Sequence, residues 1–522
     1  MSGDVAERVA SGAVSTPPAA GGAVAGIRPG RTEPVALEEL ARALGVPAEA
    51  SYGGVAVTGV TLDSRSVRAG DLYAALPGAV THGARFTEAA RTAGAVAVLT
   101  DAAGAEPAAA SGLPVLVVEA PRAVLGAVAA RVYGEPTKDV RLLGVTGTNG
   151  KTTTTYLLDA VLRRLGPSAL IGTIETRVGD EVVKSVRTTP EATDLQALFA
   201  VMRERGVGTC AMEVSSHALA LGRVDGARFT VAGFTNLSQD HLDFHAGFED
   251  YFAAKASLFT PERCDVAVVN TDDPYGARLA GSVKVELVTV SPSGAAADWR
   301  VEHTAAEGQR TRIGIAGPDG ERFEVVIALP GDFNVANALI AAVMLRRIGV
   351  PAGEIAAGLA EATVPGRMEL FTRADRLAVL VDYAHTPDAV ALALRAARAA
   401  TTGKVISVVG CGGDRDRGKR PAMGAAAARN SDVVVITDDN PRSEDPAAIR
   451  AAVVEGAREA GGTDVREIGD RRAAIAAAIE LGGPGDTVVV LGKGHETGQE
   501  IASVVHPFDD RQTVRELLEV RR

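Results

Sequence analysis

Leu142-Leu143-Gly144-Val145-Thr146-Gly147-Thr148-Asn149-Gly150-Lys151-Thr152-Thr153 is the stretch that decides the fold. An apolar run rich in branched side chains ends in a glycine-containing loop, and a helix is expected over residues 152–165. Backbone N–H groups of such a loop and the positive end of the helix favour anionic oxygens. Lys151 is placed to reach the β- and γ-phosphates of a nucleotide, and the Thr152 hydroxyl to ligate Mg²⁺. The stretch predicts a strand, a phosphate loop and a helix.

The loop departs from the common phosphate-loop pattern at one position. The pattern G-x-x-x-x-G-K-[ST] requires a glycine five places before Gly150, where this chain has Val145. Glycines stand at 144 and 147 instead. An ordinary surface loop is the alternative for this segment alone, but its place between a buried-type strand and a helix favours nucleotide binding.

Length and composition favour a layered α/β protein of about three domains. The 522 residues are 46% hydrophobic and 4% aromatic, which suits layers built from small side chains. A net charge of −11 argues against nucleic acid as the main partner. The three cysteines, Cys210, Cys264 and Cys411, have no metal or redox spacing, so free thiols in a reducing compartment are expected.

The chain start is uncharged over residues 9–27 but too rich in glycine, serine and proline for a signal peptide or membrane span. We therefore expect a cytoplasmic protein without membrane insertion. Residues 1–34 are expected to form a flexible leader, 35–136 a small α/β domain, 137–366 a central domain and 367–522 a third domain.

Buried-type strands alternate with helical segments in the last two domains, and each strand ends in polar residues. Because the carboxyl ends of parallel strands meet at one edge, chemistry-capable side chains are expected to gather there. We predict a central, mostly parallel sheet of the P-loop ATPase type and a C-terminal, Rossmann-like doubly wound domain. The expected strands are 208–212, 229–234, 265–270, 405–409, 433–436 and 487–491, with a hairpin over 312–315 and 323–327.

Several polar residues have two interpretations when taken singly. Glu213 ends a strand and could hold Mg²⁺, or it could be a capping or ion-paired acid. Lys255 lies in an expected helix, where a lysine is ordinarily a solvated surface charge. Asn337 could cap a helix or contact adenine. His241 and His245 have metal-pair spacing, but no Glu-x-x-His pattern supports a zinc protease.

The chain contains these motifs in one order: Gly147–Thr153, Thr188-Thr189-Pro190, Glu213–His217, Asp240–Asp243, Pro365–Arg367, Asp382–His385 and Asp439–Arg442. Together they resemble the Mur ligases from about residue 58 to the end. That family uses a phosphate loop with valine at the position of Val145. The resemblance implies a three-domain ligase in which ATP phosphorylates the D-glutamyl carboxylate of UDP-N-acetylmuramoyl-L-alanyl-D-glutamate. A diaminopimelate amine then attacks the acyl phosphate, giving tripeptide, ADP and phosphate for peptidoglycan synthesis.

The resemblance also implies roles for individual residues. Lys151, Glu213, His241 and Lys255 are expected to be catalytic. Mg²⁺ is expected on Thr152, Glu213, His241 and Lys255, with the lysine carried as a carbamate formed from CO₂. ATP is expected on Gly147, Thr148, Asn149, Gly150, Lys151, Thr152, Thr153, Asn337, Arg367 and Asp382. The nucleotide-sugar peptide is expected on Leu62, Ser64, Ala79, Val80, Thr81, Thr188, Thr189, Ser215 and Arg223.

Diaminopimelate is expected on Arg415, Asp439, Asn440, Pro441, Arg442, Gly492 and Glu496. It differs from lysine by a second carboxylate, which Arg442 can meet with paired N–H donors while Glu496 accepts from the adjacent ammonium. Lysine as acceptor is the nearest alternative. A P-loop hydrolase or kinase and a non-catalytic scaffold are alternatives of other classes. Leu221 stands where some relatives carry glutamine, and a monomer is expected.

Overall fold

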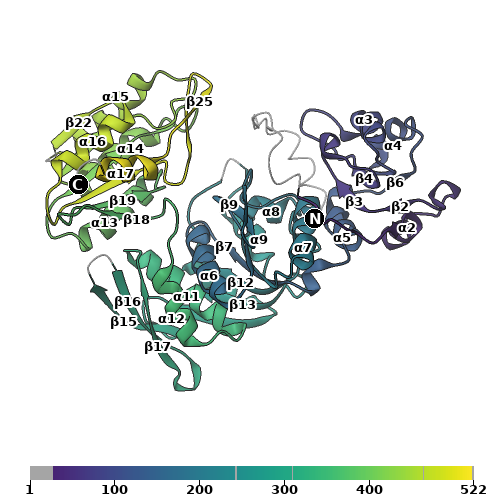
Figure 1. Ribbon diagram of the computed structural model, residues 1–522, viewed down its shortest axis with the longest axis horizontal. Coiled ribbons are helices and arrows are strands. Elements are labelled where there is room, and N and C mark those ends of the chain that lie inside the picture. The colour runs from purple at the N-terminus through teal and green to yellow at the C-terminus, as the bar shows by residue number, and fades with distance from the viewer. Residues whose placement is uncertain (1–26, 242–243, 308–309, 462–463, 520–522) are drawn as a thin grey trace. The chain divides into compact units, whose positions relative to one another are not determined.

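The computed structural model describes residues 27–241, 244–307, 310–461 and 464–519 (Figure 1). The chain forms two compact units. The first runs to Ser291 and includes Ile340–Pro351, and the second comprises Pro292–Leu339 and the chain from Ala352 onward. Within the described ranges, no helix is both long enough and apolar enough to cross a bilayer.

The first unit begins with a small parallel sheet of order β3-β4-β5-β6. Leu72, Leu99 and Leu116 from its strands pack with Leu125 of helix α5 in a core that is closed to water. The elements are β1 (Val35–Ala36), α2 (Leu37–Leu44), η1 (Ala50–Tyr52), β2 (Ala56–Val57), β3 (Gly59–Thr61), η2 (Ser64–Ser66), β4 (Asp71–Ala74), η3 (Gly83–Phe86), α3 (Thr87–Thr92), β5 (Ala97–Thr100), α4 (Ala102–Ala109), β6 (Val115–Val117), α5 (Pro121–Val132) and η4 (Pro136–Lys138).

The larger sheet of this unit has the order β10-β9-β8-β11-β7-β12-β13-β14. Strands β8, β11, β7, β12, β13 and β14 run parallel, and β9 and β10 add an antiparallel edge. The elements are β7 (Arg141–Thr146), α6 (Lys151–Leu165), β8 (Ser168–Ile171), β9 (Glu175–Val178), β10 (Glu181–Lys184), α7 (Ala192–Glu204), β11 (Thr209–Glu213), α8 (Ser216–Ala220), β12 (Phe229–Phe234), α9 (Phe248–Ala256), β13 (Cys264–Asn270), α10 (Pro274–Ala280) and β14 (Glu286–Ser291).

The second unit contains an antiparallel meander and helix α12, and helix α11 spans the division between the units. The expected hairpin is confirmed, with Ile313 opposite Val325. The elements are β15 (Trp299–Glu307), β16 (Arg310–Ala316), η5 (Pro318–Gly320), β17 (Arg322–Ile327), α11 (Asp332–Arg347) and α12 (Ala352–Glu361).

The C-terminal sheet has the order β18-β19-β23-β20-β21-β22, parallel except for the edge strand β18. The non-sequential order is that of a doubly wound fold. The elements are β18 (Glu369–Thr372), β19 (Ala378–Asp382), α13 (Pro387–Ala399), β20 (Val405–Val409), α14 (Lys419–Asn430), β21 (Val433–Ile436), α15 (Pro446–Glu459), β22 (Asp464–Glu467), α16 (Arg471–Leu481), β23 (Thr487–Leu491), β24 (Gly498–Ile501), β25 (Val504–Pro507) and α17 (Asp510–Glu519).

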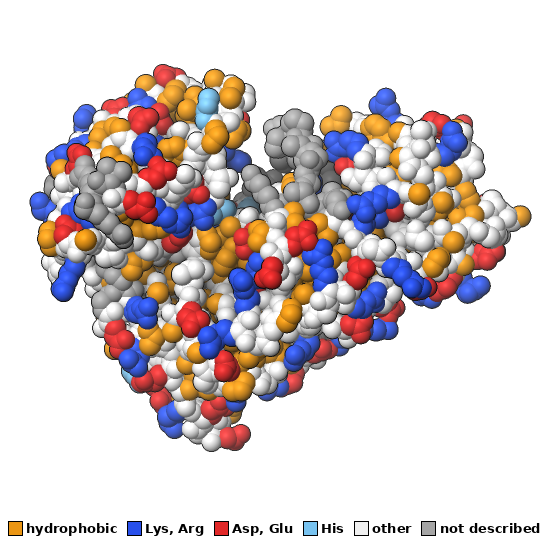
Figure 2. All heavy atoms as spheres, in the orientation of Figure 1, with side chains coloured by type: hydrophobic (Ala, Val, Ile, Leu, Met, Phe, Trp, Pro, Cys, Tyr) orange, Lys and Arg blue, Asp and Glu red, His pale blue; other side chains and the backbone are white. Residues whose placement is uncertain are grey.

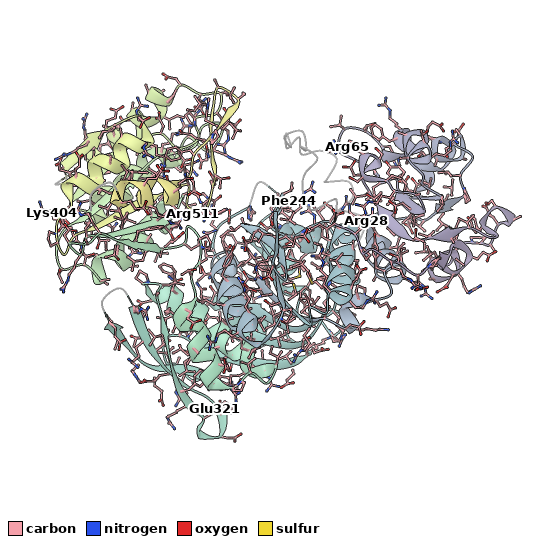
Figure 3. All side chains as sticks on the ribbon, in the orientation of Figure 1. Arg28, Arg65, Phe244, Glu321, Lys404 and Arg511 are labelled. Carbon is pink, nitrogen blue, oxygen red and sulfur yellow. The ribbon has the colours of Figure 1, made fainter. Side chains whose placement is uncertain are left out.

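The α/β class and the mostly parallel central sheet are confirmed. On the face drawn in Figure 2, basic and acidic side chains are interspersed rather than gathered by sign. Residues 27–34 of the expected leader contact the first unit. Arg28, which is labelled in Figure 3, donates to Asp71 and to the Tyr133 hydroxyl, and the Gly30 amide donates to Glu204. Leu242 and Asp243 of the quoted motif, and residues 1–26, lie outside the described residues.

Candidate active site

The phosphate loop connects β7 to α6 at the carboxyl edge of the central sheet. Gly147 and Gly150 have φ of 149° and 87°, which glycine adopts without the strain of a side chain. A Cβ at Gly147 would lie 1.9 Å from Oγ1 of Thr235, so the close approach also requires glycine. The Thr148 and Asn149 amides donate to Asn236, which ties the loop to the end of β12.

Gly144 and Val145 belong to strand β7 rather than to the loop. A Cβ at Gly144 would lie 2.6 Å from the ring of Phe229, so this glycine serves packing between β7 and β12. Val145 is fully buried. The departure from the common pattern therefore falls in the strand, and the loop itself keeps both glycines that it needs.

Glu213 links the phosphate loop to the next strand exit. It lies at the end of β11, fully buried, and its Oε2 accepts from the Thr152 hydroxyl at 3.0 Å. Thr173, after β8, donates its amide to Oε1 at 2.8 Å and its hydroxyl to Oε2 at 3.1 Å. Among the described residues, Glu213 accepts from threonines and is neither a helix cap nor part of an ion pair, and Thr152 and Glu213 form an oxygen pair of the kind that Mg²⁺ takes in proteins.

Lys151 and Lys255 both point at the carbonyl oxygens of the loop. Lys151 Nζ donates to Gly147 and Thr148 at 2.9 and 2.8 Å, and Lys255 Nζ donates to Gly147 at 2.7 Å. Lys255 is only 1% exposed and lies 4.5 Å from the centre of the Tyr251 ring. The prediction that Lys255 is a solvated surface charge is wrong, because α9 places this side chain in the interior. Burial, and then the charge of Lys151, hold the pKa of Lys255 well below its usual 10.5.

His241 lies in a group of rings beside the loop. Its ring meets His217 edge-on at 4.7 Å, and its Nε2 lies 3.5 Å from Asp240. His217 in turn packs against Phe244 at 4.1 Å (Figure 3). Among the described residues, no three His, Cys, Asp or Glu side chains are arranged to hold a metal ion. Thr152 and Glu213 provide oxygens that could hold Mg²⁺ together with the oxygens of a bound nucleotide, an environment that Mg²⁺ commonly has in proteins.

The expected substrate residues of the central domain are brought together next to Glu213. Thr188 lies 3.0 Å from the Thr173 hydroxyl. Thr189 donates to the Glu213 carbonyl and accepts from the Ser215 amide. Arg223 Nη1 lies 3.5 Å from the Thr189 carbonyl. These contacts form an unbroken series from Thr152 to Arg223.

The expected substrate residues of the first domain lie on two turns. Asp63 caps η2 and pairs with Arg65 (Figure 3), which places Leu62 and Ser64 on a fixed loop. Ala79 and Val80 are exposed, Val80 almost completely at 98%. Thr81 accepts from Arg85. The hydrogen bonds of these residues are those of ordinary turns.

In the second unit, Arg367 stacks 4.6 Å from the Tyr383 ring, and its buried Nε has no protein partner among the described residues. Both oxygens of Asp382 accept backbone amides, from Met368 and Ala384. Burial raises the pKa of Asp382 despite nearby Arg367. Asn337 is buried in α11 and donates to Asn334, so it is not a helix cap.

The expected acceptor residues of the second unit converge on a hydrogen-bonded group. Asn440 Nδ2 donates to Glu496 Oε2 at 2.9 Å, and Lys493 Nζ donates to both side chains at 3.0 Å. Arg442 has φ of 54° and donates Nη1 to the Gly413 carbonyl. A Cβ at Gly492 would lie 2.5 Å from Asp439, and Arg415 is exposed. Pro441 is buried.

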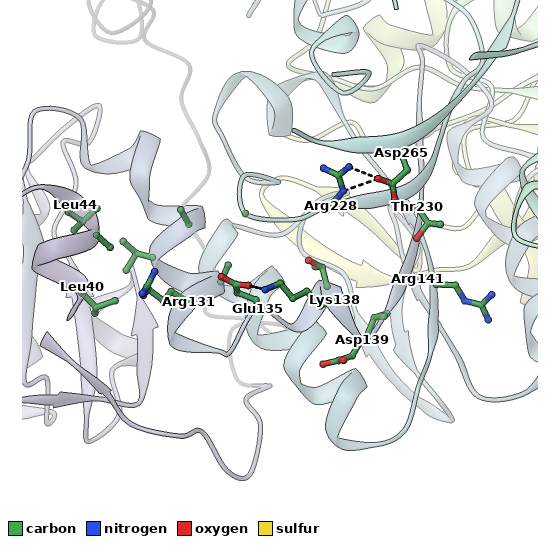
Figure 4. A pocket seen from close by; sticks show the side chains of 17 residues that line it. Leu40, Leu44, Arg131, Glu135, Lys138, Asp139, Arg141, Arg228, Thr230 and Asp265 are labelled. Atoms are coloured by element: carbon green, nitrogen blue, oxygen red, sulfur yellow. Dashed lines mark hydrogen bonds and ion pairs between the residues drawn. The ribbon is translucent and has the colours of Figure 1, made fainter. Parts of the chain in front are cut away.

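A cavity of about 670 Å³ lies elsewhere in the first unit (Figure 4). It is lined by Arg141, Thr230 and Asp265, near the starts of β7, β12 and β13, so it faces the sheet edge away from the phosphate loop. Its charged groups are largely paired, Arg228 with Asp265 and Lys138 with Glu135. None of the expected site residues lines it.

Sequence reasoning missed Thr173, Glu191 and Lys493. Thr173 follows a short strand in Leu170-Ile171-Gly172-Thr173, and a Cβ at Gly172 would lie 2.5 Å from Glu213. A glycine and a hydroxyl at a strand exit were the available signal. Lys493 directly follows Gly492, an expected acceptor residue, and Glu191 directly follows Thr188-Thr189-Pro190.

Comparison with known proteins gives three family matches that together cover most of the chain. Residues 56–133 match "Mur ligase family, catalytic domain", 145–345 match "Mur ligase middle domain" and 366–494 match "Mur ligase, glutamate ligase domain". Similar curated proteins are UDP-N-acetylmuramoyl-L-alanyl-D-glutamate–2,6-diaminopimelate ligases. The enzyme of Streptomyces coelicolor is 55% identical to this chain, over 94% of this chain and 98% of its own length. The enzyme of Corynebacterium glutamicum is 49% identical, over 91% of this chain and 94% of its own length.

Solved structures give the same family. A ligase of the same name aligns with a TM-score of 0.70 and 32% identity over 94% of this chain and 99% of its own. MurF from Acinetobacter baumannii aligns with a TM-score of 0.63 and 18% identity over 94% and 99%, which shows a shared fold.

Proposed function

Because the chain belongs to the Mur ligase family and is an ATP-dependent ligase of peptidoglycan synthesis, we propose that its amine substrate is diaminopimelate. The amine is joined to the D-glutamyl carboxylate of UDP-N-acetylmuramoyl-L-alanyl-D-glutamate. A carboxylate is a poor acyl donor until one of its oxygens becomes part of a phosphate leaving group. The γ-phosphoryl group of ATP therefore passes to that oxygen, and the amine nitrogen then displaces phosphate as it loses a proton.

The observation that supports activation of the carboxylate by ATP is the series of contacts from Thr152 through Glu213, Thr173 and Thr188 to Thr189 and Arg223. It joins the phosphate loop to the residues expected to bind the nucleotide-sugar peptide. A phosphoryl donor and a carboxylate acceptor must lie next to each other for direct transfer, since alignment supplies most of the catalysis in such reactions. A simple ATP hydrolase would not need such a connection.

The phosphate loop, from Gly147 to Thr153, is assigned the ATP phosphates, with Lys151 exchanging its loop carbonyls for phosphate oxygens. Thr152 and Glu213 are the residues that would hold Mg²⁺, with His241 beside them. Bound Mg²⁺ supplies charge neutralisation between two anions that otherwise repel. Thr173 keeps the Glu213 carboxylate oriented toward Thr152 by holding both of its oxygens. Asn337, Arg367 and Asp382 are assigned to ATP in the second unit.

Lys255 is assigned as the carbamate ligand of this site. Burial lowers the pKa of Lys255, which favours the neutral amine, the form whose lone pair can attack CO₂. The new N–C bond forms as the nitrogen loses one N–H proton, so the neutral amine becomes an anionic carbamate. This change removes the repulsion with Lys151 and provides an oxygen ligand for a divalent cation.

The acceptor is selected by the second unit. Arg442 offers N–H donors to the distal carboxylate of diaminopimelate, and Glu496 accepts from the adjacent ammonium. Glu496 is held in place by Asn440 and Lys493. A site built for such polar groups can reject an analogue lacking them by ~10⁴-fold. Gly492, Asp439, Pro441 and Arg415 are assigned to the same site, and the enzyme is proposed to act as a cytoplasmic monomer.

The test is an assay of phosphate release and of new amide with the nucleotide dipeptide and one amine at a time. The amines are meso-diaminopimelate, LL-diaminopimelate and L-lysine. We expect amide formation with a diaminopimelate isomer and about 10⁴-fold lower kcat/KM with lysine. Equal or better use of lysine would overturn the acceptor assignment. ATP consumption without any amide would overturn the proposed reaction.

A further inference from the structure

Glu191 is a buried carboxylate that collects three arginines from separate segments of the first unit. Its side chain is 8% exposed. Arg223 Nε lies 2.9 Å from Oε1, Arg122 Nη1 lies 3.2 Å from Oε2 and Arg187 Nη1 lies 3.8 Å from Oε1. We call these four residues the Glu191 cluster.

The fold forces Arg122 of α5 toward Arg223. A Cβ at Gly126 would lie 2.1 Å from the Asp225 carbonyl, and a Cβ at Gly226 would lie 2.4 Å from the Gly126 carbonyl. These two glycines therefore let α5 contact the segment that follows α8 directly. Arg122 precedes Gly126 by four residues and so lies on the same face of α5.

The charges of the Glu191 cluster do not balance. Three guanidinium groups face one carboxylate, and Asp194, the neighbouring acid on α7, supplies at most one more negative charge. Burial and the charge of Glu191, partly offset by Arg28 and Arg187, raise the pKa of Asp194 to about 6. Burial, together with Arg187 and Arg122, lowers the pKa of Arg223. At least one excess positive charge is therefore held in a partly desolvated place, which favours an anionic ligand.

Two of the arginines are reachable by a ligand while Arg223 is mostly covered. The exposed fractions of the side chains are 39% for Arg122, 44% for Arg187 and 13% for Arg223. The carboxylate of Glu191 has only two oxygens with which to accept from three guanidinium groups. The outer N–H groups of Arg122 and Arg187 are therefore available for an oxyanion. Arg223 also lies 3.5 Å from the Thr189 carbonyl, which joins the cluster to the series of contacts described above.

We propose that Arg122 and Arg187, aligned with Arg223 by Glu191, bind an oxyanion of the nucleotide-sugar peptide. This inference rests on the proposed function. The shared chemistry is a phosphate or carboxylate group, supplied either by the diphosphate or by the peptide part. Glu191 is then a positioning residue, which fixes three flexible guanidinium groups before the substrate arrives and lowers the entropy cost of binding.

The test measures KM for all three substrates in Arg122→Gln and Arg187→Gln. Each substitution removes one charged hydrogen bond to the bound substrate. We therefore expect the KM for the nucleotide-sugar peptide to rise about 10- to 100-fold and kcat to change less than about threefold. KM for ATP and for the amine is expected to stay within about twofold. Arg122→Lys keeps the charge and is expected to recover most of the loss.

Arg131→Gln is the matched control, since Arg131 lies on the same helix, is similarly exposed and pairs with Glu39 outside the cluster. Competition binding then separates the two sources of the oxyanion. UDP-N-acetylglucosamine carries the diphosphate without a peptide, and N-acetylmuramoyl-L-alanyl-D-glutamate carries the carboxylates without a diphosphate. Weaker binding of either competitor to Arg122→Gln and Arg187→Gln, but not to Arg131→Gln, supports the inference and identifies the group.

The inference would be overturned if the wild type is active and the Arg122→Gln and Arg187→Gln variants both match Arg131→Gln in KM and in competitor binding. That result would leave the proposed function intact. A wild type that forms no amide from the nucleotide dipeptide would instead overturn the proposed function. In that case the competitor binding still tests the oxyanion site by itself.

Discussion

Lys255 of the first unit and Lys493 of the second are both buried lysines, with 1% and 0% exposure. Lys493 has a carboxylate partner, Glu496 at 3.0 Å, and an amide oxygen, Asn440 at 3.0 Å. Lys255 donates to the Gly147 carbonyl and lies over the Tyr251 ring. It forms no ion pair with a described carboxylate, and Asp240 acts on it only as a negative charge beyond ion-pair distance. Lys151 adds a repulsive charge nearby.

The difference teaches that burial alone does not define the role of a lysine. An ammonium taken out of water needs a counter-charge, and where none is provided the neutral amine is favoured. Lys493 holds Glu496 in place through this pair. Burial and the charge of Lys151 lower the pKa of Lys255, which favours the neutral amine that the proposed addition of CO₂ uses.

The largest expected effect follows from removing Lys255. Lys255→Ala is expected to lower the rate of amide formation by about 10³-fold, because an anionic ligand of the metal region is lost. Added acetate or formate is expected to restore part of the activity in this variant and none in Lys493→Ala. Unimpaired turnover of Lys255→Ala would contradict the role given to this lysine.

The next effect separates the two lysines by stability. Lys493→Met leaves Glu496, whose side chain is 33% exposed, beside Asn440 without its cation, and is expected to destabilise the second unit by about 1–2 kcal/mol. Lys255→Met removes an unpaired buried amine and is expected to be neutral or stabilising. Thermal unfolding of both variants checks this. A larger loss for Lys255→Met than for Lys493→Met would reverse the comparison.

A smaller effect is expected at the acceptor side of the second unit. Arg442→Ala is expected to lower kcat/KM for diaminopimelate about 30-fold, the value of one charged hydrogen bond. KM for ATP is expected to change little. Steady-state kinetics with each substrate varied in turn measures both. Equal losses for diaminopimelate and ATP would show that Arg442 supports the fold rather than the acceptor.

The smallest effect is a pH dependence of stability. A lysine with a lowered pKa in the folded chain binds fewer protons there than when unfolded. The free energy of unfolding therefore rises with pH, up to the ordinary pKa of 10.5, by at most ~1.4 kcal/mol per pH unit. Denaturant unfolding in CO₂-free buffer between pH 7 and 9 measures this slope. It should be smaller in Lys255→Met, and an identical slope would show that Lys255 is already paired.

The sequence predicted helices and strands well where a helix buries one face or a strand is buried completely. Strand β12 has the expected bounds, and β7, the loop and α6 follow from Leu142 to Leu165 within one residue. Apolar runs and glycine spacing are local signals, so they survive without knowledge of the fold. The domain boundaries at 136 and 366 stay predictions.

The site was harder to predict from the sequence, because it is formed by contacts between segments that lie far apart in the chain. Lys255 reads as a surface lysine until α9 turns it onto Gly147, 108 residues earlier. Thr173 and Glu191 carry no motif of their own, and only folding shows that they hold Glu213 and Arg223. The assignments of individual ligands to site residues also stay predictions.

The most direct test of the contrast between the two lysines is ¹³C nuclear magnetic resonance of the protein equilibrated with ¹³C-bicarbonate. We predict a protein-bound carbamate signal in the wild type and in Lys493→Met, and its absence in Lys255→Met. A wild type without that signal, or a signal that persists in Lys255→Met, would contradict the claim that the unpaired buried amine of Lys255 is the site of CO₂ addition.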